Sequence, residues 1–136
     1  MAHEDALDFI RRNPRAVLAT HRRDGGIQQS PVLATVDDHD RVVISTRTGA
    51  MKTLNLRRDP RASLCALNNA FFGEWHGVDG TVEIVELPEA MEPLVDYYRR
   101  VSGEHPDWDE YRAAMASEGR VLLRLTVERS APHVEG

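Results

Sequence analysis

The chain has 136 residues, a formal net charge of −5 and 41% hydrophobic residues. This length predicts a single domain, residues 1–136, that buries roughly two thirds of its unfolded surface. The acidic balance argues against a nucleic-acid-binding surface, and no apolar run approaches membrane-spanning length. The N-terminal stretch lacks the charged start and apolar core of a signal peptide, so we expect a cytoplasmic protein.

Hydrophobic periodicity and turn residues predict six strands and four helices. In chain order, the strands are 16–21, 28–36, 41–46, 62–67, 75–85 and 120–127. The helices are 5–12, one that begins near Gly49 and stops at Asp59-Pro60, 88–101, and a short one after Pro106. Gly77 and Gly80 interrupt the fifth strand, which predicts a bulge or the close approach of another backbone or a ligand.

Six short strands that follow one another in sequence favour one architecture. We expect a mainly β protein, an antiparallel barrel with helices on its outside, because closure removes exposed sheet edges. A barrel this small is filled by its own side chains. A ligand as large as a flavin would therefore lie on the outer surface or between two subunits.

Basic residues gather in one short segment, 45–63, of this acidic chain. The segment carries five basic residues against one acid, a local charge of +4, and the other residues sum to −9. The basic residues are Arg47, Lys52, Arg57, Arg58 and Arg61. Such clustering favours an anion held in one place. Because the segment passes from a strand through Thr48-Gly49 into a helix, backbone N–H groups and the helix dipole would suit a phosphate there.

Lys52 is the first candidate ligand-binding residue of this segment. Lys52 and Asn55 lie three residues apart on one helix face, so a cation and an amide could reach one ligand, although Asn55 is equally suited to anchoring a loop. Met51 and Leu54 share the neighbouring face, which we expect to pack inward. We interpret Arg57, Arg58 and Arg61 as structural or solvated. For Arg57 and Arg58 the reason is that positive charge complements the C-terminal end of a helix.

Signatures of autonomous catalysis are missing from the sequence. The histidines are scattered without metal-ligand spacing, and Cys65 has no second cysteine beside it, so no metal site is expected. No Ser-His-Asp elbow, Walker loop or dinucleotide-binding glycine motif is present. A bound cofactor would therefore supply most of any chemistry, and the catalytic residues remain unknown.

Several motifs together carry a family resemblance. They are VLAT at 17–20, VVIST at 42–46, MKTLNLRRDPRASL at 51–64, GEHPDWDEYRAAM at 103–115 and RVLLRL at 120–125. In this order they resemble the pyridoxamine 5'-phosphate oxidase-like split-barrel proteins, and most of all the actinobacterial flavin/deazaflavin oxidoreductases that use coenzyme F-420. The resemblance implies an FMN-binding-type split barrel and a homodimer with its cofactor in a groove at the subunit interface.

The resemblance also implies a set of cofactor-binding residues, which lie at the strand ends, on the basic helix and on one aromatic position. The set is Lys52, Asn55, Thr46, Ser45, Arg47, Gln28, Ser30, Val32 and Trp75. Lys52 matches the family's phosphate-binding lysine, and Ser45 and Thr46 match the strand end at the ribityl-phosphate chain. The strand from Gln28 to Val32 matches the one that faces the ring.

Two of these assignments, Trp75 and Arg47, have separate reasons. Trp75 matches an aromatic position that approaches the phosphate from the partner chain, or else it packs in the interface. Arg47 would supply charge that close relatives have just before Lys52, where Gly49 and Ala50 stand here.

The function implied is an F-420-dependent reductase that transfers a hydride to an electron-poor double bond of a small organic substrate. The protein would position and desolvate the reactants, and no proton donor is assigned. One alternative is an FMN-dependent oxidoreductase of the same fold, and another is a non-enzymatic carrier or sensor. A nucleic-acid-binding module is opposed by the net charge and by the lack of aromatic residues among the bases. The expected partners are a second copy and a small substrate, without nucleic acid or membrane.

Overall fold

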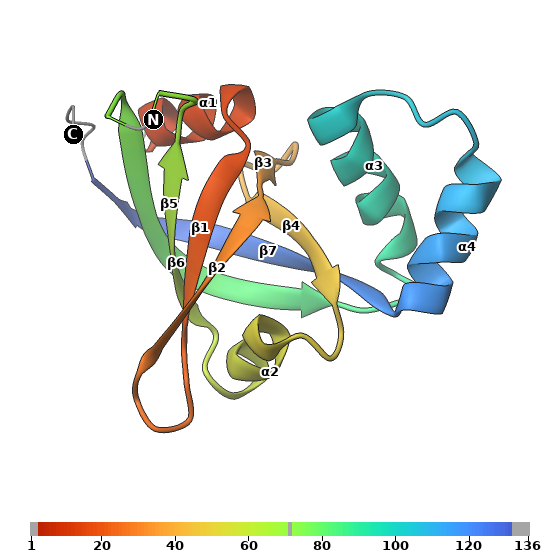
Figure 1. The fold of residues 1–136 in the computed structure, drawn as a ribbon, viewed down its shortest axis with the longest axis horizontal. Helices are drawn as coiled ribbons and strands as arrows, with labels where there is room; N and C mark the ends of the chain where they lie inside the picture. Colours follow the sequence, from red (N-terminus) through yellow and green to blue (C-terminus); the bar gives the residue numbers. More distant parts are fainter. Residues whose placement is uncertain (1–2, 71, 132–136) are drawn as a thin grey trace.

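The computed structural model describes residues 3–70 and 72–131, arranged as in Figure 1. The helices are α1 (Glu4–Arg12), α2 (Met51–Arg58), α3 (Met91–Ser102) and α4 (Trp108–Glu118). The strands are β1 (Arg15–His21), β2 (Ile27–Leu33), β3 (Thr35–Val36), β4 (Val42–Arg47), β5 (Arg61–Leu67), β6 (Trp75–Val85) and β7 (Arg120–Ser130). The mainly β architecture with flanking helices that the sequence predicts is confirmed.

One antiparallel sheet holds the seven strands in the order β2-β1-β5-β6-β7-β4-β3. The sequence predicts six strands, but the predicted strand 28–36 is divided at Ala34 into β2 and β3. These two lie at opposite edges of the sheet, although only the buried Ala34 separates them. The sheet therefore curls until its edges meet at this residue, and β2 and β4 diverge from there (Figure 1). This divergence is the split of the barrel.

Two hydrophobic cores lie on opposite faces of β4 and β7. The first fills the curled sheet beneath α1, and its largest members are Phe9, Ile10, Leu18, Leu64 and Leu123. The second lies between the sheet and the α3–α4 pair, and it includes Val43, Leu94, Tyr111, Met115 and Leu122. Because β4 and β7 are covered on both faces, their sequences are continuous apolar runs rather than alternating ones.

The long strands β6 and β7 pair around a bulge at Asp79 and Gly80. A Cβ atom on Gly80 would lie 1.9 Å from the carbonyl oxygen of Thr126, so no side chain fits. The predicted close backbone approach is confirmed at this glycine. At Gly77 a Cβ would make only ordinary contact, 3.7 Å from the Trp75 ring, so that glycine marks no comparable approach.

Helix α2 differs from its predicted packing. Met51 and Leu54, expected to face inward, are 59% and 45% exposed. The helix instead buries Thr53, Asn55 and Leu56, because it is short and turns this side toward β1 and β6. None of the helices within residues 3–70 and 72–131 is long and apolar enough to cross a membrane.

Candidate functional site

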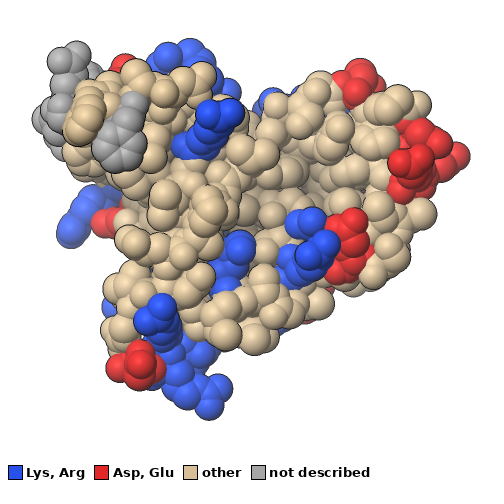
Figure 2. Space-filling view, in the orientation of Figure 1, with Lys and Arg blue, Asp and Glu red and all other residues tan. Residues whose placement is uncertain are grey.

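A pocket of about 610 Å³ opens where the barrel is split. Its walls come from β2, β4, α2, the α3–α4 pair and the start of β7. The lining residues are Pro31, Val32, Leu33, Ser45, Thr46, Arg47, Ala50, Lys52, Tyr97, Tyr98, Tyr111, Met115, Glu118 and Arg120. Figure 2 shows the molecular surface hollowed between the barrel and the α3–α4 pair, with basic side chains along the lower rim of the hollow. The divergence of β2 and β4 thus creates this cavity.

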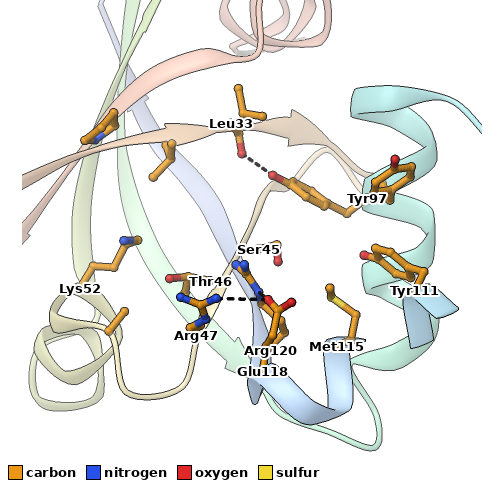
Figure 3. Close-up of a pocket in the computed structure, with 14 residues that line it drawn as sticks. Leu33, Ser45, Thr46, Arg47, Lys52, Tyr97, Tyr111, Met115, Glu118 and Arg120 are labelled. Carbon is orange, nitrogen blue, oxygen red and sulfur yellow. Dashed lines mark hydrogen bonds and ion pairs between the residues drawn. The ribbon is translucent and has the colours of Figure 1, made fainter. Parts of the chain in front are cut away.

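Lys52 is the second residue of α2, and its half-buried side chain reaches toward β2 (Figure 3). Burial lowers the pKa of Lys52, and the positive charge of Arg120 lowers it further. No carboxylate among the described residues forms an ion pair with it. A cation that is partly desolvated and next to a like charge has a strong electrostatic preference for an anionic ligand.

The N-terminus of α2 reinforces this preference. Ala50 occupies the N-cap position and has no side-chain oxygen with which to accept from the first N–H groups. The turn before it is fixed by the Thr53 hydroxyl, which donates to the carbonyl oxygen of Arg47 at 2.7 Å. Both Ala50 and Lys52 line the pocket, so the positive end of the helix dipole and the lysine act on the same space.

Two arginines and one acid form a second charged group at the floor of the pocket. Arg47 and Arg120 are directly paired across β4 and β7. Glu118 Oε1 lies 2.9 Å from Arg120 Nε and 3.5 Å from Arg47 Nη2 (Figure 3). The hydrogen bond from Arg120 and the charges of both arginines hold the pKa of Glu118 below its usual range. The carboxylate therefore stays ionised and partly neutralises this pair.

The other end of the pocket is aromatic and apolar. The Tyr97 hydroxyl crosses from α3 to donate to the carbonyl oxygen of Leu33 on β2, at 2.8 Å (Figure 3). Tyr111 donates to the carbonyl oxygen of Leu94, also at 2.8 Å. Burial raises the pKa of Tyr97, and burial with the nearby tyrosines raises that of Tyr111 to about 12. Both hydroxyls stay neutral and committed to backbone oxygens, so this end suits a flat, uncharged group.

Five of the nine predicted cofactor-binding residues meet in this pocket. They are Lys52, Ser45, Thr46, Arg47 and Val32. Ser30 lies on the same face of β2 as Val32, and its Oγ is buried without a hydrogen-bond partner. An orphaned buried hydroxyl next to the pocket fits a polar ligand atom that would complete it.

Asn55 and Gln28 lie elsewhere, in a second groove on the far side of α2. The Asn55 side chain is 3% exposed and donates to the Thr20 hydroxyl at 3.1 Å, while Thr20 donates to Gln28 Oε1 at 3.3 Å. The expectation that Lys52 and Asn55 reach one ligand is therefore not met. Asn55 has the anchoring role that was its alternative, because its side chain ties α2 to β1.

Trp75 opens β6, opposite Leu67 of β5, and does not line the pocket of its own chain. Its predicted approach to the phosphate from a partner chain stays a prediction. Arg58 donates to the carbonyl oxygen of His21 at 2.6 Å, and Arg57 and Arg61 form ion pairs with Glu86 and Asp59. These three arginines have structural partners, as their interpretation from the sequence expects.

Sequence reasoning missed the floor and the aromatic end of the pocket. The main omissions are Glu118, Arg120, Tyr97 and Tyr111. They lie 64 or more positions beyond Leu33 in the chain, and only strand pairing and the docking of α3 and α4 bring them to β2 and β4. The one available signal was the pair of charges at 118 and 120, which flanks Gly119 immediately before an apolar strand.

Comparison with known proteins agrees with this fold. The family model for pyridoxamine 5'-phosphate oxidase matches residues 2–133. A conserved hypothetical protein from Mycobacterium tuberculosis is 26% identical, with a TM-score of 0.77 over 100% of this chain and 92% of that one. The chain therefore belongs to the pyridoxamine 5'-phosphate oxidase family, and its general class is that of oxidoreductases.

Two further solved structures share the fold. An F420 reductase is 20% identical, with a TM-score of 0.71 over 91% of this chain and 94% of that one. A pyridoxamine 5'-phosphate oxidase-related, FMN-binding protein from Nostoc punctiforme is 14% identical, with a TM-score of 0.70 over 99% and 84%. At these identities the likeness concerns the fold alone.

Proposed function

We propose that the protein is a coenzyme F-420-dependent reductase whose cofactor phosphate binds at Lys52. The observation that carries this proposal is a half-buried lysine without a carboxylate partner among the described residues, at the uncapped start of α2, in a pocket with an aromatic far end. An F420 reductase among the proteins of this fold favours the deazaflavin. When bound, reduced F-420 supplies a hydride to an electron-poor double bond of a small organic substrate.

The residues of the chain bind and orient in this proposal. Lys52 and the first N–H groups of α2 hold the phosphate, and Ser45 and Thr46 lie along the path from the phosphate toward the aromatic end. Leu33, Tyr97 and the neighbouring aromatic side chains exclude water from the reacting atoms. No acid is assigned to proton delivery, because Tyr97 and Tyr111 both donate to backbone carbonyls, so the proton comes from solvent.

We also propose a homodimer in which the partner completes the site. The outer face of β2, β1, β5 and β6 carries a cross-strand row of small and apolar residues: Pro31, Val17, Cys65 and Gly77. Beside it lies an apolar groove of about 430 Å³, and Leu33 at its edge is 46% exposed. A sheet face of this composition favours burial against a second copy. The predicted approach of Trp75 to a partner's site depends on this arrangement.

Hydride transfer tests the proposed function directly. Reduced F-420 mixed with the protein and a cyclic enone should lose its reduced-state absorbance with turnover, whereas reduced FMN under the same anaerobic conditions should support less. Binding of F-420 without turnover on any activated enone would favour the carrier alternative. Faster turnover with reduced FMN would favour the FMN-dependent oxidoreductase, for which a single phosphate at Lys52 would suffice.

A further inference from the structure

Glu118 is the only acidic side chain in the lining of the pocket described above, which also holds three cations. Both of its ion pairs use the same oxygen, Oε1, at 2.9 Å from Arg120 and 3.5 Å from Arg47. The remaining cation, Lys52, has no such partner among the described residues. Of the three positive charges, one is therefore open to a ligand and two share a carboxylate.

The backbone gives Glu118 a fixed place between the two arginines. It is the last residue of α4, and Gly119 follows in the left-handed conformation, with φ of 63°, before Arg120 begins β7. The carbonyl oxygen of Gly119 accepts from the N–H of Thr48 at 2.8 Å, which ties this turn to the loop before α2. Since Arg47 and Arg120 are cross-strand neighbours of like charge, an acid at this turn offsets their repulsion.

The two ion pairs are unequal in how easily a ligand can replace them. The Arg120 side chain is 27% exposed and its pair with Glu118 is short, whereas the Arg47 side chain is 62% exposed and its pair is long. Exposed ion pairs are weak and screened by salt. Arg47 can therefore leave Glu118 for an anion on the ligand, while Arg120 stays.

We propose that Glu118 is a specificity-determining residue of this pocket, which makes any second anionic group on the ligand compete with its carboxylate for Arg47. The pocket then accepts one phosphate at Lys52 readily and gains less from further negative charge. This inference rests on the proposed function, since it assumes that the ligand's first phosphate lies at Lys52.

The experiment compares two probes, FMN with one phosphate and F-420 with a phosphate and an acidic tail. Glu118→Gln should raise the affinity for F-420 about fivefold at low salt, the size expected for release of one exposed ion pair, and that for FMN much less. Glu86→Gln is the matched control, because Glu86 forms a 3.1 Å ion pair with Arg57 outside the pocket. It should leave both affinities unchanged.

The double variant Arg47→Met/Glu118→Gln identifies the route of the effect. The gain for F-420 should disappear in it, because the freed arginine is then absent. Equal gains for both probes, no gain, or a gain that persists without Arg47 would overturn the inference.

If Glu118→Gln does not fold, Glu118→Asp replaces it. Glu118→Asp should show a smaller gain in affinity for F-420 than is expected for Glu118→Gln, again larger than its gain for FMN. No gain in affinity for F-420 would overturn the inference here too. Lys52→Ala separates failure of this inference from failure of the proposed function. If Lys52→Ala weakens binding of both probes but Glu118→Gln has no effect, only this inference fails. If Lys52→Ala leaves binding unchanged, the proposed phosphate site at Lys52 fails as well.

Discussion

At the scale of single residues, the site depends on the electrostatic situation of Lys52. Its ammonium is half-buried beside the like charge of Arg120, and both effects lower its pKa. In the free protein this shift opposes folding at pH values where the lysine is charged, because the unfolded chain binds the proton more tightly. A bound phosphate reverses the situation, since it favours the charged form. The lysine is thus better explained by ligand binding than by stability.

The lowered pKa of Lys52 predicts a pH dependence of anion binding. Affinity for F-420 should be full below the pKa of Lys52 in the free protein and should fall as the pH rises through it, starting below the usual lysine range. Lys52→Arg should remove this fall, because a guanidinium stays charged there. Fluorescence titrations between about pH 7.5 and 10 measure it, with the ligand phosphate fully ionised throughout. The same alkaline loss in both proteins would show that another group is responsible.

At the scale of elements, helix α2 is held against the sheet by a polar network beside its one buried apolar residue, Leu56. Asn55 donates to the Thr20 hydroxyl and accepts from Arg58 at 3.2 Å, while Met51 and Leu54 lie in solvent. Thr20 is fully buried, so this network fixes α2 relative to β1. The position of Lys52 therefore depends on a side chain that does not touch the pocket.

Removing this anchor should destabilise the protein. Asn55→Ala leaves buried polar groups without a partner, and we expect it to lower the free energy of unfolding by about 1–3 kcal/mol. Leu54→Ala, one position earlier on the exposed side of the same helix, is the control and should change it by less than about 0.5 kcal/mol. Urea unfolding followed by tryptophan fluorescence provides the comparison. Equal effects of the two substitutions would refute the anchoring role.

The sequence predicts most elements but not the contacts between them. Strand alternation locates β1, β5 and β6, and Asp59-Pro60 ends α2 as expected. The break at Ala34 is missed, because an apolar run carries no local sign that its two halves join opposite edges of a sheet. The predicted inward face of α2 is wrong because two of its three buried positions, Thr53 and Asn55, are polar, so hydrophobic spacing alone points to the other side.

The same distinction holds for the candidate site. The sequence identifies the Lys52 end of the pocket, because Lys52 and the end of β4 are neighbours in the chain. It cannot identify Glu118, Arg120 or Tyr97, because those reach the pocket only through β4–β7 pairing and the placement of α3. Charge clustering in one segment overestimates the free charge, since acids from distant segments pair with Arg47 and Arg57.

At the scale of the whole molecule, the proposed dimer rests on the split of the barrel and on the exposed sheet face, which a second copy would cover. We expect a dimer at micromolar concentration by sedimentation. Val17→Lys, in the centre of the apolar row, should produce monomers and weaken F-420 binding. Thr126→Lys, on the exposed side of β7, should change neither. A wild type that is a stable monomer at micromolar concentration and still binds the cofactor would contradict the proposed dimer.

Whole-molecule charge also bears on the choice between the two cofactors. The chain is acidic overall, yet the pocket lining holds three cations and one acid. F-420 carries an acidic tail beyond its phosphate, so the local field favours it over FMN through weak surface contacts that salt screens. Arg47 is the candidate for the tail, whereas Arg58 of the same basic segment is already bonded to His21 and Asn55.

Fluorescence titration of the wild type and Lys52→Ala with F-420 and FMN, at low and physiological ionic strength, tests the central claim most directly. The account predicts that F-420 binds more tightly than FMN at low salt and that salt narrows the difference. It also predicts that Lys52→Ala, still folded, weakens both ligands by about ten- to a hundredfold. Unchanged affinity in folded Lys52→Ala would contradict the phosphate site. Equal binding of F-420 and FMN at low salt, or a preference independent of salt, would contradict the choice of F-420.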